Sequence, residues 1–176
     1  MTYLRLLFAG TVFLASFLLF LVEPIAARQL LPVLGGSAAV WITCLVFFQT
    51  ALLIGYLYAH WLAGRPQWIL HSLLLVVATV SAILWVLRPL ATDNGAAHPI
   101  VTVFAALGLS IGLPFLALSA TSPLLQVWWA RLETGKVPHR LYALSNFASL
   151  LALGLYPTVI EPSLSSRKFA QALPMV

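Results

Sequence analysis

Long apolar runs, each about the length of a membrane-crossing helix, alternate with short polar segments along this chain. A helix rises about 1.5 Å per residue and needs about 20 apolar residues to cross a hydrocarbon layer of roughly 30 Å. Five stretches meet this requirement, at residues 6–26, 38–62, 68–87, 99–122 and 141–160. The pattern predicts an all-α integral membrane protein with about five transmembrane helices.

Prolines and polar residues mark the expected helix ends. Glu23 with Pro24, and Glu161 with Pro162, follow the first and fifth apolar runs. The fourth run stays apolar to residue 130, and we expect it to cross once and kink at Pro114, because proline interrupts helical hydrogen bonding. Two short helices crossing twice are the alternative, but no polar turn of adequate length separates the halves. These boundaries predict one transmembrane domain, 1–162, and a short tail, 163–176.

The composition of the chain indicates that most of its surface contacts lipid rather than water. Hydrophobic residues make up 62% of the chain and charged residues 7%, against about 25% charged residues in soluble domains. So few charged residues cannot cover the surface of a water-soluble protein. We therefore expect the lipid bilayer to contact most of the surface of this chain. The nine Lys and Arg are dispersed at the ends of apolar runs, which favours membrane-flanking cations and argues against nucleic acid. With five crossings, five of these cations lie on the side of the membrane that holds the amino terminus and four on the other, which favours a cytoplasmic amino terminus in a bacterial-type inner membrane.

Glu23 is the strongest single candidate for a functional side chain. A carboxylate at the end of an apolar helix is costly unless it reaches water or a partner, so it faces a cavity or pairs with a cation. Arg28, about one and a half turns further on, is a local partner. The sequence leaves both interpretations open, a structural pair at the interface or a functional carboxylate.

Other polar residues lie inside the predicted helices. Gln49 and Thr50 occupy mid-depth in the second helix, and Ser145 and Asn146 lie near the start of the fifth. Such amides and hydroxyls join helices by hydrogen bonds or contact a solute, and the sequence does not separate the two roles.

Two pairs of small residues are spaced four apart. Gly108 pairs with Gly112 in the fourth run, and Ser145 pairs with Ser149 in the fifth. This spacing is typical of close helix packing, either within the chain or against another chain.

The sequence predicts neither a metal site nor an enzyme. No two of the four histidines stand at helical ligand spacing, and none lies in a cluster with Cys, Asp or Glu, so we interpret them as interfacial residues. Phosphate loops, dinucleotide glycine fingerprints and nucleophile elbows are absent from the sequence. We therefore expect no cofactor and no catalytic residues.

Several motifs resemble a known family. They are Phe-Leu-Val-Glu-Pro-Ile-Ala-Ala-Arg at 20–28, Leu-Pro-Val-Leu-Gly-Gly at 31–36, Gly-Tyr-Leu-Tyr-Ala-His at 55–60, Leu-Ser-Ala-Thr-Ser-Pro-Leu-Leu-Gln at 118–126 and Arg-Leu-Tyr-Ala-Leu-Ser-Asn at 140–146. Together they resemble the amino-terminal membrane region of fused major-facilitator/spermidine-synthase-like proteins, over roughly residues 6–162. The resemblance implies a fold like part of a major-facilitator half. The synthase domain is lacking, so aminopropyl transfer is not expected.

The resemblance and the polar positions together supply the candidate pathway or packing residues. These are Glu23, Arg28, Gln49, Tyr56, His60, Ser122, Tyr142, Ser145, Asn146 and Glu161, with Gly108, Gly112 and Ser149 as helix-packing residues.

Three functions remain open at this point. The first is a transporter-like module for a small polar or cationic solute, which would dimerise or join another half. The second is a non-catalytic accessory subunit packed against a larger membrane complex, and the third is a membrane anchor for a separate polyamine-synthase-like enzyme. The first two make other membrane subunits, or a second copy of the chain, the expected protein partners.

Overall fold

The computed structural model describes residues 2–34, 37–64, 68–86, 99–132 and 138–163. Its elements are α1 (Thr2–Leu34), α2 (Ala38–Ala63), α3 (Trp68–Val86), α4 (Pro99–Leu107), the π-helical turn η1 (Gly108–Gly112), α5 (Leu113–Leu132), α6 (His139–Leu155) and the π-helical turn η2 (Tyr156–Ile160). No strand occurs in these ranges, so the predicted all-α class is confirmed there.

Four helices are long and apolar enough to cross a membrane. They span Tyr3–Gln29, Ala38–Ala63, Ile100–Leu132 and His139–Ser163, and Trp68–Leu84 is a shorter apolar helix. Large apolar side chains stand exposed along all of them, among them Leu109, Phe147 and Val76. Such a surface suits lipid rather than water, as expected for a membrane-embedded protein.

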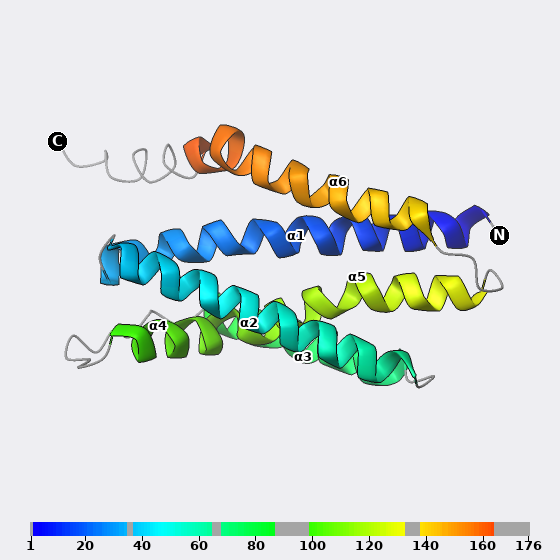
Figure 1. Cartoon of the computed structure of the whole chain (residues 1–176), viewed down its shortest axis with the longest axis horizontal. Helices are drawn as coiled ribbons and strands as arrows, with labels where there is room; N and C mark the ends of the chain where they lie inside the picture. The colour runs from blue at the N-terminus through cyan, green and yellow to red at the C-terminus, as the bar shows by residue number, and fades with distance from the viewer. Residues whose placement is uncertain (1, 35–36, 65–67, 87–98, 133–137, 164–176) are drawn as a thin grey trace.

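The helices form an elongated bundle in which successive rods run in opposite directions (Figure 1). The segments α4, η1 and α5 follow one another as one long rod. In the bundle α1 packs most extensively against α6 and α5, while α2 and α3 both pack against α5. The direct contact between α5 and α6 is slight, although both lie against α1.

An aromatic core joins α2 to the rod formed by α4, η1 and α5. Phe47 lies edge-on to Phe48 and Phe104, with ring centroids 5.5 and 5.6 Å apart, and Phe48 lies 5.2 Å from Phe115. The predicted packing pair Gly108 and Gly112 faces this cluster. A Cβ atom at either glycine would lie 3.9 Å from the ring of Phe47, in ordinary contact.

The irregularity expected at Pro114 takes the form of the π-helical turn η1, immediately before it. Pro114 has no N–H to donate to the carbonyl four residues earlier, and a local widening of the helix accommodates this loss in membrane proteins. The rod therefore continues through Pro114 and Pro123, and it ends at Leu132 rather than at residue 122 as predicted.

The predicted end of the first helix is wrong. We expected it near residue 26, after Glu23 and Pro24, but α1 continues to Leu34. Proline is a weaker stop signal in a membrane helix, because neighbouring helices bond the polar groups of the surrounding backbone. The neighbouring turn η2 contacts α1 at this point, where the Tyr156 hydroxyl donates to the carbonyl of Pro24 at 3.3 Å. The predicted loop at 91–98 and most of the predicted tail, 164–176, lie outside the described residues.

A polar cavity between α1, α2, α5 and α6

A cavity of about 660 Å³ opens where α5 and α6 diverge from one another on the surface of α1. Its lining comes from four helices, with Ser16, Leu19 and Phe20 from α1, Tyr56 from α2, Ser119, Ser122, Pro123 and Gln126 from α5, and Tyr142, Ser145, Asn146, Ser149, Leu150 and Leu153 from α6. None of these lining residues carries a formal charge, and nine of the fourteen bear a hydroxyl or an amide.

Helical periodicity explains why the polar groups of α5 converge. Ser119, Ser122 and Gln126 are spaced three and four residues apart, which places them on one helix face. All three are buried, as is Ser16 of α1. On α6 the residues Tyr142, Ser145, Asn146 and Ser149 repeat the same spacing, but Tyr142 and Asn146 are exposed. The cavity thus has polar groups on its buried floor, and its exposed rim carries both polar side chains, Tyr142 and Asn146, and the leucines Leu150 and Leu153.

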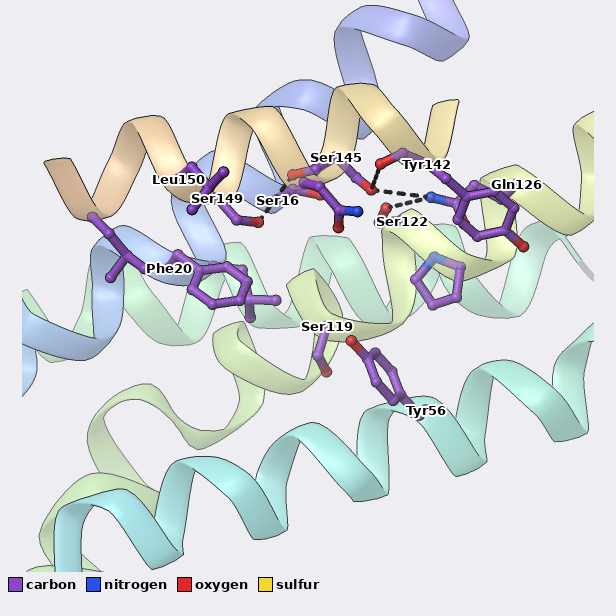
Figure 2. Close-up of a pocket in the computed structure, with 14 residues that line it drawn as sticks. Ser16, Phe20, Tyr56, Ser119, Ser122, Gln126, Tyr142, Ser145, Ser149 and Leu150 are labelled. Carbon is purple, nitrogen blue, oxygen red and sulfur yellow. Dashed lines mark hydrogen bonds between the residues drawn. The ribbon is translucent and has the colours of Figure 1, made fainter. Parts of the chain in front are cut away.

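Gln126 links the two sides of the cavity (Figure 2). Its Nε2 donates to the Ser122 hydroxyl at 3.2 Å within α5 and to the Ser145 hydroxyl of α6 at 3.5 Å. Ser145 in turn donates its own proton to the carbonyl of Tyr142 at 3.0 Å. The bond from Gln126 to Ser145 holds α5 and α6 together where their direct contact is otherwise slight.

The structure brings five of the predicted pathway residues into this cavity: Tyr56, Ser122, Tyr142, Ser145 and Asn146. Ser149, predicted as a packing residue, also lines it, and its hydroxyl donates to the Ser145 carbonyl at 2.9 Å.

The remaining candidates lie elsewhere. Gln49 and His60 are exposed on α2 and are not among the cavity lining. Arg28 pairs with Glu161 rather than with its sequence neighbour Glu23, at 3.7 Å to the carboxylate and 3.3 Å to the backbone carbonyl. Since α1 and α6 run in the same direction, their Glu-Pro pairs lie at the same end of the bundle, and this contact fastens them there (Figure 1).

Sequence reasoning did not single out Ser16, Ser119 or Gln126 as site residues. The signal was available in part, because Ser119, Ser122 and Gln126 form a polar stripe at helical spacing within an apolar run. Ser16 stands alone in α1 and carries no such signal.

His71, near the start of α3, is buried against α5 and only 4% exposed. Its Nε2 lies 3.1 Å from the hydroxyl of Thr121, and its ring is 6.1 and 6.3 Å from the rings of Tyr58 and Trp128. A polar side chain between helices is retained where a hydroxyl partner and aromatic neighbours surround it. His71 is not among the residues that line the cavity.

Within the described ranges, His, Cys, Asp and Glu side chains do not gather in a group of three or more that would hold a metal ion. Comparisons with protein families, with characterised proteins and with solved structures yield no match to this chain. The function is therefore argued from the cavity itself.

Proposed function

We propose that this chain is a transporter-like membrane module that holds a small polar solute in the cavity between α1, α2, α5 and α6. One observation carries the proposal. Buried hydroxyls and an amide from α1 and α5 converge on a cavity of about 660 Å³ inside a bundle whose outer surface is apolar. Polar groups within a membrane either mark solute pathways or join helices. Among the buried polar residues of the cavity, only Gln126 joins two helices by a side-chain bond in the described structure, which favours a pathway role for the others.

The proposal includes five crossings. At about 1.5 Å per residue, the 19 residues of α3 extend about 28 Å, close to the roughly 30 Å of a hydrocarbon core. Five alternating rods agree with part of a major-facilitator half, which the sequence motifs suggest. Transporters of that type move two halves around a central site, so we propose that a second copy or another subunit completes the path. The proposed location is a bacterial-type inner membrane with a cytoplasmic amino terminus.

Uptake into proteoliposomes tests this function. Purified protein is reconstituted and supplied with radiolabelled glucose, choline or succinate, which represent a neutral, a cationic and an anionic solute. We expect uptake of at least one probe above the rate of protein-free vesicles. Gln126→Leu should lower that uptake about tenfold, because a lost polar contact in a buried site is worth on the order of 1.4 kcal/mol.

A matched pair of milder variants separates a pathway defect from a folding defect. Ser149→Ala removes a cavity hydroxyl that donates to a carbonyl of its own helix, and Ser81→Ala removes a hydroxyl of the same kind from α3, outside the cavity. We expect only Ser149→Ala to reduce uptake. If no probe enters the vesicles and the native protein migrates in fixed ratio with other membrane proteins, the accessory-subunit function replaces this proposal.

A further inference from the structure

Three of the five serine hydroxyls that line the cavity have already used their protons. Ser119 donates to the Leu116 carbonyl at 2.9 Å, Ser145 to the Tyr142 carbonyl at 3.0 Å and Ser149 to the Ser145 carbonyl at 2.9 Å. A hydroxyl has one proton and two acceptor lone pairs. Each of these serines therefore has only acceptor capacity left for a solute.

The two protons of the Gln126 amide are also used in hydrogen bonds within the protein. Because the Ser145 proton goes to the Tyr142 carbonyl, the Ser145 oxygen accepts, and the atom facing it must be the Gln126 nitrogen. That nitrogen has two protons, and they serve Ser122 and Ser145. The Gln126 carbonyl oxygen is the part of the amide that remains, and it too is an acceptor.

The absence of charge among the lining residues restricts the solute further. A cation moved into this site would lose its hydration without gaining a carboxylate, and an anion would meet acceptor lone pairs without a cation. A neutral solute avoids both penalties. Beside the acceptors, Phe20, Tyr56 and Tyr142 add aromatic rings to the lining, which suit the C–H faces of a compact ring or carbon chain (Figure 2).

We infer that the cavity accepts an uncharged solute rich in hydroxyls, of the polyol or monosaccharide class, because a hydroxyl donates to these acceptors and also accepts from the Tyr56 and Tyr142 hydroxyls and the Asn146 amide of the lining. This inference rests on the proposed function and narrows the solute beyond a polar or cationic one. The size of the cavity, about 660 Å³, falls within the range of roughly 300–1,000 Å³ typical of small-molecule sites.

Transport of matched neutral probes tests the inference in proteoliposomes. Sorbitol, glucose and myo-inositol are each compared with their fully O-methylated derivative, and choline and succinate serve as charged probes. We expect at least one polyol to be taken up and its methylated form to enter about tenfold more slowly, because methylation removes the donors and keeps the carbon skeleton. Ser149→Ala should reduce polyol uptake, and Ser81→Ala should not.

The possible results separate the inference from the function on which it rests. Uptake of choline or succinate without any polyol overturns the inference and leaves the module a transporter. Equal uptake of a polyol and its methylated form also overturns it, because donor groups would then not matter. No uptake of any probe, together with migration of the native protein in fixed ratio with other membrane proteins, overturns the proposed function itself.

Discussion

Replacing Gly55 with alanine is expected to lower the free energy of unfolding by about 1–3 kcal/mol, the usual cost of overpacking a close contact. A Cβ atom at Gly55 would lie 1.8 Å from the Ser119 hydroxyl oxygen and 2.9 Å from the Ser119 Cβ atom. Rotation of the hydroxyl relieves the first clash but not the second, so α2 and α5 must move apart. The same movement displaces Ser119 from the cavity floor.

Thermal unfolding in mild detergent measures this effect. Gly10→Ala is the matched control, since a Cβ atom there meets nothing within 4 Å. Removing the opposing side chain should restore packing. The double variant Gly55→Ala/Ser119→Gly should therefore lose less free energy of unfolding than the two single variants lose together. Equal unfolding temperatures for Gly55→Ala and Gly10→Ala would show that α2 and α5 do not approach this closely.

Truncating Phe115 to alanine is expected to destabilise the bundle by about 3 kcal/mol or more, as in buried Phe→Ala variants of other proteins. Phe115 is fully buried and packs its ring against Phe48 of α2. Lipid is as apolar as the core, so helix association in a membrane depends on such packing contacts. The truncated side chain would leave a void beside η1, where the rod is already irregular.

Phe147→Ala is the control for this variant, because it is the same substitution at a phenylalanine of α6 that is 58% exposed. Unfolding by heat or by denaturing detergent should distinguish the two variants clearly. Similar stability of Phe115→Ala and Phe147→Ala would contradict the described aromatic core.

The sequence predicted the helices well because apolar length is a direct physical requirement of the bilayer. The starts of α2 and α3, at Ala38 and Trp68, agree with the predicted ranges. The end of α1 did not, because proline is a strong stop signal for helices in water and a weaker one for helices packed within a membrane.

The cavity was predictable only in part. Ser145 and Asn146 attract attention because they are polar in an apolar run. Their meeting with Ser16 and Gln126 depends on which helices pack together and on the divergence of α5 from α6. Both depend on tertiary packing, which the sequence of a single helix does not determine. The same limit applies to Arg28, whose partner Glu161 is 133 residues away, whereas the partner expected from the sequence, Glu23, is about one and a half turns away.

The central claim is that a polar, water-accessible cavity lies inside this membrane bundle, and cysteine labelling tests it most directly. In a background where the buried Cys44 is replaced by serine, Ser145→Cys and Val76→Cys are exposed to a charged, water-soluble thiol reagent added to both sides of sealed membranes. Ser145 lines the cavity, whereas Val76 is 59% exposed on the apolar outer surface of α3. Thiols react with such reagents as thiolates, which form in water and not in lipid. We predict rapid labelling of Ser145→Cys and none of Val76→Cys; protection of both positions would contradict the claim.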